Sequence, residues 1–217
     1  MDFLKIVPGG VGFKETHRLN MDAFPDEERL DTELLARLSE QGRLELLGIY
    51  DNDSYIGFTV IFHGERSVYV FFLAIDPAWR SHGYGSAVLN ALRVRYAGRQ
   101  LVLDIEPLDP AASNYEQRLR RKSFYLRNGF RESGCFFKYC GMCFEVLYDG
   151  APAPAASVPG NGSSDCAPRM GTGSAAFASA AVPAFDMDSY LSMLEDIKRL
   201  VEDCGFEGFE PRVDNFQ

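Results

Sequence analysis

Residues 67–76, SVYVFFLAID, are apolar almost without interruption. A strand with one exposed face alternates apolar and polar side chains, whereas an unbroken run of this length is typical of a central strand buried on both faces. The chain must therefore place packed layers on both sides of a sheet. Its 217 residues, 46% of them hydrophobic, are enough for one such domain.

Hydrophobic periodicity and turn residues predict the elements around this strand. Before it we expect a strand at 3–7, helices at 14–24 and 26–42, and a hairpin of strands 43–50 and 54–63. After it we expect a helix at 84–97, a strand at 101–106, a helix from the capping box Ser113–Glu116 to Asn128, and a hairpin of 131–139 and 142–148. The order predicts an α/β (α+β) domain over residues 1–150, with a mixed, mostly antiparallel central sheet flanked by helices.

The composition changes after residue 150. Residues 151–184 are dominated by Ala, Pro, Gly and Ser, which predicts a flexible linker because few large apolar groups offset the entropy of ordering. Residues 185–217 then contain an amphipathic helix over about 187–203, which Gly205 is expected to stop, and a short tail. The apolar face of this helix needs a partner. It either docks on its own domain or serves as a partner-binding or homodimer contact.

Charge and cysteine content narrow the classes of partner. The net charge is −9 without a large basic tract, which argues against a nucleic-acid partner. No apolar run approaches the roughly 20 residues that span a bilayer, and the amino terminus lacks a signal-peptide pattern, so we expect no membrane partner and a cytoplasmic location. The five cysteines are an odd number, which argues against a disulfide framework. We expect Cys140 and Cys143 to be buried strand thiols rather than half of a metal site, since no second such pair exists.

The turn Arg80-Ser-His-Gly83-Tyr-Gly85 links the central strand to the next helix. A helix N-terminus carries unpaired N–H groups and a partial positive charge, and the two glycines remove side chains that would keep an anion away. The motif lacks the lysine of a nucleotide-triphosphate loop and the third glycine of a dinucleotide turn. By itself it fits both a tight capped turn and a diphosphate site.

A second motif gives this turn a context. Arg-x-x-Gly-x-Gly follows a strand ending LAIDP, and Phe124-Tyr125-x-x-x-Gly129-Phe130 follows roughly forty residues later. Together they resemble the general-control-related N-acetyltransferases, the GNAT superfamily. The resemblance covers roughly residues 2–148, with the elements in the expected order. It implies acetyl-CoA as acyl donor, a primary amine as acceptor, and direct transfer within a ternary complex without a cysteine nucleophile.

The resemblance also implies how the donor would be held. Backbone N–H groups of about residues 81–86 would bind the pyrophosphate, and the strand end would pair with the pantetheine arm as an extra half-strand. The thioester would lie in a gap between this strand and the strand at 101–106. The cofactor-binding residues expected on this basis are Leu73, Ala74, Ile75, Arg80, Ser81, His82, Gly83, Tyr84, Gly85, Ser86 and Arg118.

Tyr125 matches the family's tyrosine that faces the cofactor sulfur. A phenol with a pKa of about 10 can protonate the departing thiolate; the alternative is a core aromatic residue beside Phe124. This chain departs from the family at Arg118 and Arg121, where many members have asparagine and alanine. Both share a helix face with Lys122 and Tyr125, either as cations for the cofactor phosphates or as a solvated basic face.

Acyl transfer also needs a neutral amine, and hence a base or a proton-relaying water. Glu106 closes the strand beside the expected thioester gap and is the first candidate, with Tyr125 as its catalytic partner. Glu27 and Glu28 lie where the family shapes its acceptor site. The alternative for each glutamate is an ordinary surface carboxylate. Acidic residues near the mouth would suit a cationic amine, whether a small molecule, a polyamine, a peptide amino terminus or a lysine.

A second function class fits the same motifs. The domain could be a non-catalytic acyl-CoA-binding or sensor module whose C-terminal helix recruits a partner. A regulatory role of the tail is a third hypothesis. Loss of turnover on changing Tyr125 to Phe would separate the enzyme from the sensor.

Overall fold

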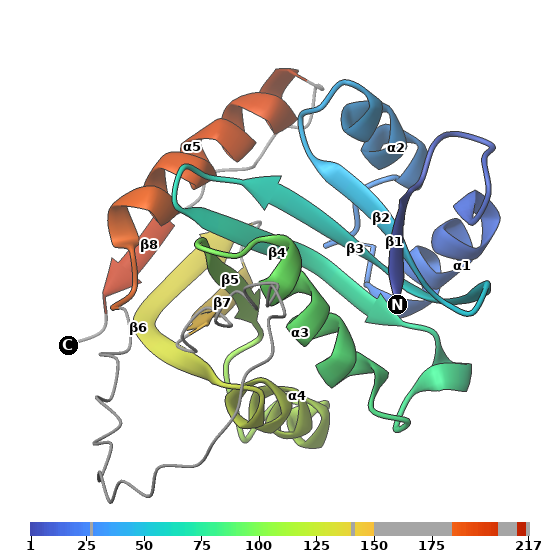
Figure 1. The fold of residues 1–217 in the computed structure, drawn as a ribbon. Helices are drawn as coiled ribbons and strands as arrows, with labels where there is room; N and C mark the ends of the chain where they lie inside the picture. The colour runs from blue at the N-terminus through green and yellow to red at the C-terminus, as the bar shows by residue number, and fades with distance from the viewer. Residues whose placement is uncertain (27, 140–141, 150–183, 204–211, 216–217) are drawn as a thin grey trace, which may run out of the picture.

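A mixed sheet runs through the middle of the molecule (Figure 1). The computed structural model describes residues 1–26, 28–139, 142–149, 184–203 and 212–215. Within these ranges eight strands pair in the order β1-β2-β3-β4-β5-β7-β6-β8. Their bounds are β1 Asp2–Lys5, β2 Glu45–Asp51, β3 Ser54–His63, β4 Ser67–Ile75, β5 Gln100–Ile105, β6 Phe130–Tyr139, β7 Met142–Asp149 and β8 Arg212–Asn215. All neighbours are antiparallel except β4 and β5, so the predicted fold class is confirmed.

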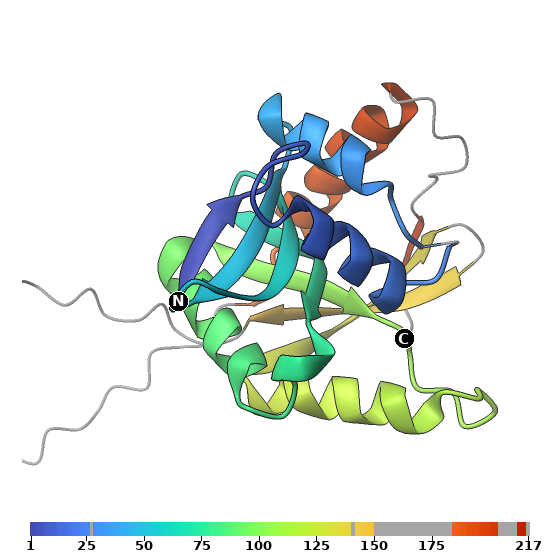
Figure 2. The ribbon, with the colours of Figure 1, turned by 90° about the vertical axis from the view of Figure 1, so that its right-hand side faces the viewer.

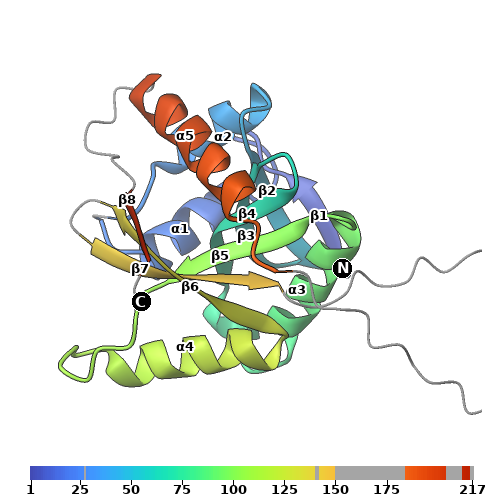
Figure 3. The same cartoon turned by 90° about the vertical axis from the view of Figure 1, so that its left-hand side faces the viewer.

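Helices cover both faces of this sheet (Figures 2 and 3). One face carries α1 (Phe13–Ala23), α2 (Thr32–Glu40) and α5 (Met187–Asp203), and the other carries α3 (Tyr84–Arg95) and α4 (Tyr115–Arg127). A single turn of 3₁₀ helix, η1 (Pro77–Trp79), links β4 to the turn before α3. The sheet is thus the middle of three layers.

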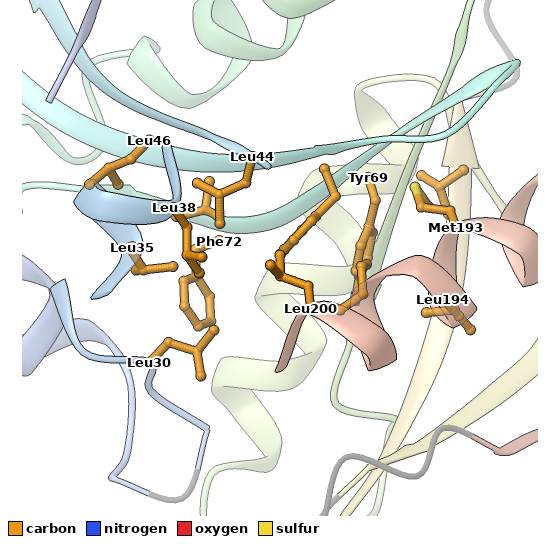
Figure 4. Close-up of a cluster of buried hydrophobic side chains, with 14 of the residues drawn as sticks. Leu30, Leu35, Leu38, Leu44, Leu46, Tyr69, Phe72, Met193, Leu194 and Leu200 are labelled. Carbon is orange, nitrogen blue, oxygen red and sulfur yellow. The ribbon is translucent and has the colours of Figure 1, made fainter. Parts of the chain in front are cut away.

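The central strand β4 contributes to two separate hydrophobic clusters. Tyr69 and Phe72 belong to the cluster under α1, α2 and α5, where side chains of α2 and α5 meet those of the sheet (Figure 4). Val68 and Val70 belong to the cluster under α3. Burial on both faces explains the unbroken apolar run that identified this strand.

The parallel pairing between β4 and β5 is short. It comprises Ser67–Gln100, Val68–Leu101 and Tyr69–Val102, and the two strands have no paired residues beyond that point. A β-bulge lies in the same region: Val60 of β3 pairs with Phe72 and Ile61 pairs with Val70, which leaves Phe71 without a counterpart. The sheet therefore opens between the carboxyl-terminal halves of β4 and β5.

Helix α5 packs against its own domain. Its bounds agree with the predicted helix, and the buried side chains of its apolar face are Tyr190, Met193, Leu194, Ile197 and Leu200. Figure 4 shows the side chains of Met193, Leu194 and Leu200 on the face of the sheet that carries the side chain of Tyr69. Of the two hypotheses for this apolar face, docking on its own domain and contact with a partner, the structure shows docking on its own sheet.

The amino-terminal end of α5 contacts both strands of the short pairing. The Ser189 hydroxyl lies 2.9 Å from the Ser67 hydroxyl of β4, and the backbone N–H of Asp186 donates to the side-chain oxygen of Gln100 on β5 at 3.0 Å. The C-terminal helix thus bridges the two halves of the sheet.

Two expected helix starts differ from the structure, the first by six residues and the second by only two. The helix predicted from 26 begins at Thr32, because the Asp31 carboxylate accepts the N–H of Leu34 at 2.9 Å and caps it there. The capping box at Ser113 is not formed, since α4 begins at Tyr115. The side chain of Asn114 is engaged by Glu106 and Arg118 and makes no cap bond.

Strand β8 has no counterpart among the expected elements. It pairs with β6 at the outer edge of the sheet, where Cys135–Lys138 lie opposite Arg212–Asn215. Four residues are too few to show a period by themselves. Of the predicted linker only residue 184 lies within the described residues, and Gly205 lies outside them; the three-part division of the chain stays a prediction.

The structure bears on the expectations about membrane-spanning segments and cysteines only within the described residues. In the described ranges no helix is both long and apolar enough to cross a membrane. Cys140 lies outside the described residues, whereas Cys143 is half-buried on β7 and Cys135 is buried on β6. Within the part of the chain that the structure describes, no group of three His, Cys, Asp or Glu side chains could hold a metal ion.

Docking of α5 can be tested by cavity formation. Leu194 is 2% exposed, so we expect Leu194→Ala to lower the free energy of unfolding by about 2–5 kcal/mol. Leu191, on the same helix, is 40% exposed, and Leu191→Ala should change that free energy by less than about 0.5 kcal/mol. Urea denaturation followed by circular dichroism measures both, and equal small effects would mean that α5 does not dock.

Candidate active site

The turn between η1 and α3 uses its two glycines for different purposes. Gly83 is the N-cap of α3 with φ 83°, a left-handed conformation, and no side chain caps the helix. A Cβ at Gly83 would meet no atom within 4 Å, so the space in front of the helix end is open. A Cβ at Gly85 would lie 2.9 Å from the ring of Phe124 on α4. Gly83 therefore leaves the helix end open, while Gly85 permits close packing of α3 on α4.

Hydrogen bonds hold the chain rigidly as it leaves β4. The Asp76 carboxylate accepts the N–H of Ala78 at 3.0 Å and an N–H of Arg18 at 2.6 Å. The Arg80 guanidinium donates to the carbonyl of Ile75 at 2.9 Å. The turn is thus tied to the strand end that precedes it, which fixes the direction of the free N–H groups of α3.

Tyr84 and His82 contribute to the turn in another way than expected. The Tyr84 hydroxyl donates to the Asp51 carboxylate at 2.9 Å, and this hydrogen bond raises the pKa of the phenol. The His82 ring lies 2.7 Å from the carbonyl of Arg80. Neither side chain lines the groove that begins at this turn. Any contact of these two residues with a cofactor would therefore come from their backbone N–H groups.

A groove of about 650 Å³ extends from this turn into the opening between β4 and β5. Most of the expected cofactor residues line it: Leu73, Ala74, Ile75, Arg80, Ser81, Gly83, Gly85 and Ser86. Its other walls come from β5 and α4, with Leu103, Asp104, Ile105, Phe124 and Tyr125. Because β4 has no β5 partner beyond Tyr69, its edge can pair with an extended ligand lying in this groove.

Tyr125 faces the groove from α4 and is partly buried. Its ring packs between Phe124 and Phe130, with centroid distances of 5.1 and 5.5 Å. Burial raises the pKa of its phenol to about 12; the charge of Arg121 opposes this shift and that of Asp104 adds to it. The phenol stays protonated at neutral pH, so it can donate a proton or a hydrogen bond into the groove.

Glu106 and Arg118 engage each other instead of facing the groove. The Glu106 carboxylate lies 2.8 Å from the Arg118 guanidinium and 3.2 Å from that of Arg121, and the Asn114 amide also donates to it. Arg118 in addition donates to the carbonyl of Pro107 at 3.0 Å. The expected cofactor contact of Arg118 therefore has no support in this geometry, and the oxygens of the proposed base Glu106 are already engaged by donors.

The basic side chains on the Tyr125 face of α4 are paired with carboxylates of the same domain. Lys122 lies 2.8 Å from the buried carboxylate of Glu145 on β7 and also pairs with Glu132 on β6. These partners raise the pKa of Lys122 against the effect of burial. Ion pairs with Glu106, which follows β5, and with residues of β6 and β7 thus anchor α4. Neither of the two interpretations of this face from the sequence included such pairing.

A second cavity, of about 240 Å³, adjoins the groove, and residues that follow α1 and residues of α4 both line it. Glu28 and Glu106 line it, whereas Glu27 lies outside the described residues. The two cavities share part of their walls: Ala23, Phe24, Phe71, Asp104, Ile105, Gln117 and Arg121. A ligand in the groove and a second ligand in this cavity would therefore meet inside the opening of the sheet.

Asp104 is the titratable group at this meeting point, and the sequence analysis did not single it out. It lies on β5 two residues beyond the last pair with β4, and it is partly buried. Burial raises its pKa to about 7, opposed by a hydrogen bond from the Tyr69 hydroxyl. The signal available in the sequence was one carboxylate within the apolar run LVLDI.

Comparisons with known proteins match part of this chain to a family model and its fold to solved structures. Residues 43–132 match the family model described as the acetyltransferase (GNAT) domain. Among solved structures, the fold resembles a putative GNAT-family acetyltransferase from Bacteroides thetaiotaomicron. The two are 26% identical, the TM-score is 0.59, and the match covers 70% of this chain and 88% of that one. A comparison with curated protein sequences found no match.

Two more distant structures share the fold. One is an aminoglycoside 6′-N-acetyltransferase complexed with coenzyme A, 16% identical with a TM-score of 0.53, covering 69% of this chain and 96% of that one. The other is a chimeric spermidine N-acetyltransferase from Vibrio cholerae, 17% identical with a TM-score of 0.52, covering 68% and 93%. At this identity the likeness concerns the fold.

Proposed function

Because this chain carries a GNAT acetyltransferase domain over residues 43–132, we propose that it transfers an acetyl group from acetyl-CoA to a primary amine by direct transfer in a ternary complex. The observation that carries the proposal is the junction of the groove and the second cavity at Asp104, which lines both and has no paired residue on β4. Two proteins of the same fold are named for acetylating amines, an aminoglycoside and spermidine.

The groove suits the donor in shape and in chemistry. The open N-terminus of α3 at Gly83 offers N–H groups and the positive end of a helix to the pyrophosphate. The unpaired edge of β4 from Leu73 to Ile75 offers backbone groups to the amide-containing pantetheine arm. The thioester then reaches the opening of the sheet, where Tyr125 and Asp104 line the wall.

Two protons must move during the transfer. The acceptor nitrogen attacks the thioester carbon, the new C–N bond forms, and the C–S bond breaks. Asp104 accepts the proton that the nitrogen loses, and Tyr125 donates a proton to the departing thiolate sulfur. Their pKa values, about 7 and about 12, suit a base that is ionised near neutral pH and an acid that keeps its proton.

The sensor hypothesis has little left to support it. It assigned partner recruitment to the C-terminal helix, whereas α5 buries Tyr190, Leu194 and Ile197 of its apolar face on its own sheet. Glu106 remains the rival candidate for the base and is included in the test of Asp104 below.

Donor binding can be tested at Gly83. Gly83→Ala places a Cβ at a φ of +83°, which should cost about 1–2 kcal/mol of stability, and it puts a methyl group where the pyrophosphate would lie. Gly98→Ala is the matched control, because Gly98 has φ +84° and equally open space but lies outside the groove. We expect calorimetric titration to show acetyl-CoA binding weakened about tenfold or more in Gly83→Ala alone.

Calorimetry of the unaltered protein with acetyl-CoA and with CoA comes first. Absence of binding to both ligands would mean that the glycine turn is only a turn. Equal losses of affinity in Gly83→Ala and Gly98→Ala would attribute the effect to backbone strain.

The acid role predicts a selective effect of Tyr125→Phe. The ring packing is retained and only the hydroxyl is lost, so we expect kcat to fall by about 10²–10⁴-fold while acetyl-CoA affinity changes little. Stopped-flow or thiol-release assays measure kcat, and calorimetry measures affinity. Full turnover in Tyr125→Phe would show that another group, or water, protonates the thiolate.

The base role predicts a pH dependence with a defined sign. A base must be ionised to act, so kcat/KM of the unaltered enzyme should rise with pH and level off above about pH 7. Asp104→Asn should abolish this rise and lower the plateau by about 10²–10⁴-fold. If Glu106→Gln removes the rise and Asp104→Asn retains it, the base is Glu106.

A further inference from the structure

Aromatic side chains dominate the second cavity. Five phenylalanines line it: Phe24, Phe71, Phe72, Phe137 and Phe144. Three of them form a stack, in which the ring of Phe72 lies 4.4 Å from the rings of both Phe24 and Phe71, tilted by 36° and 38°. The bulge in β4 makes this stack possible, because it turns two consecutive residues to the same side of the strand.

The rings come from parts of the fold that are far apart in sequence. Phe24 follows α1, Phe71 and Phe72 lie on β4, and Phe137 and Phe144 lie on β6 and β7. Phe72, Phe137 and Phe144 are buried, while Phe24 and Phe71 are only partly buried and so present ring surface to the cavity. Flat apolar walls of this kind favour a flat apolar ligand, through offset or edge-to-face ring contacts.

The charges in the cavity do not form the row of carboxylates that a polycation would need. Three acidic residues line it, Glu28, Asp104 and Glu106, but Glu106 is already paired with Arg118 and Arg121, and Arg121 itself lines the cavity. Asp104 lies on the wall shared with the groove and is suited to a single amino group at that end. A second ammonium group would have to pair with Glu28, and a third would lie among phenylalanines or near a guanidinium.

The volume sets a limit on ligand size. At about 240 Å³ the cavity lies below the roughly 300–1,000 Å³ typical of pockets for drug-sized ligands. An aminoglycoside or a folded peptide segment is too large to enter it whole. A ring with a short carbon chain is not.

We propose, on the basis of the proposed function, that the acceptor is a small aryl or arylalkyl primary amine, bound with its ring against the Phe24–Phe71–Phe72 stack and its nitrogen at Asp104. This orientation directs the nitrogen through the shared wall toward the groove. The sequence suggested a cationic amine of any kind as the acceptor. This proposal narrows the acceptor to a molecule with one amino group and one apolar ring.

A matched panel of acceptors tests the proposal. With saturating acetyl-CoA, kcat/KM is measured for phenethylamine, n-butylamine, spermidine and a lysine-containing peptide by following CoA release. Phenethylamine should exceed each of the other three by about tenfold or more. A preference for spermidine or the peptide would overturn this proposal and leave amine acetylation intact. Turnover of no amine, in a protein that binds acetyl-CoA, would overturn the proposed function together with it.

A substitution in the Phe24–Phe71–Phe72 stack tests whether these rings cause the preference for an aryl amine. Phe71→Leu keeps the side chain apolar but removes the ring, so the KM for phenethylamine should rise about tenfold more than the KM for n-butylamine. Phe3→Leu, at a residue that is also partly buried but lies on β1 outside both cavities, should change neither KM. Equal increases for the two amines in Phe71→Leu would assign Phe71 a structural role only and contradict the proposed ring site.

Discussion

The parallel pairing between β4 and β5 ends after three residue pairs, and the site depends on that early end. A fully paired sheet would place backbone against backbone where the two cavities now meet. The bulge at Phe71 strengthens the divergence, since an unpaired residue bends the strand that contains it. The opening exposes one edge of β4 to the groove and the face of β5 to the second cavity. One break in the pairing thus provides room for two ligands.

An opening in a sheet must be held by contacts elsewhere. On one face, α5 bridges the pair that remains, through Ser189 to Ser67 and through Asp186 to Gln100. On the other face, α4 is anchored to β7 by the ion pair of Lys122 with Glu145. Ion pairs that are this well shielded contribute less to stability than to a unique arrangement. Their consequence here is that α4, and with it the catalytic candidate on its groove side, has one position.

The two titratable side chains at this opening, Tyr125 and Asp104, have very different pKa values. Tyr125 is surrounded by the rings of α4 and β6, and burial moves the pKa of its phenol to about 12. Asp104 lies in a partly apolar setting on β5, and burial raises the pKa of its carboxyl to about 7. Ionising a buried carboxyl costs stability, so a fold keeps such a group where it has a use. An acid and a base whose proton affinities are set far apart, on the walls of one groove, are suited to a transfer that moves two protons.

The sequence alone determined the features that depend on local order. The unbroken apolar run of β4, the glycine turn before α3 and the bounds of α5 were all predicted, because helix and strand periods and turn chemistry act over a few residues. Only the tertiary structure decided which side chains meet. Glu106, a candidate base or surface carboxylate by sequence, is engaged by two arginines, while Asp104, which the sequence did not single out, lies at the junction of two cavities. Those outcomes depend on where β4 and β5 stop pairing and on which helix packs beside them, and these are contacts between segments that the sequence pattern does not relate to one another.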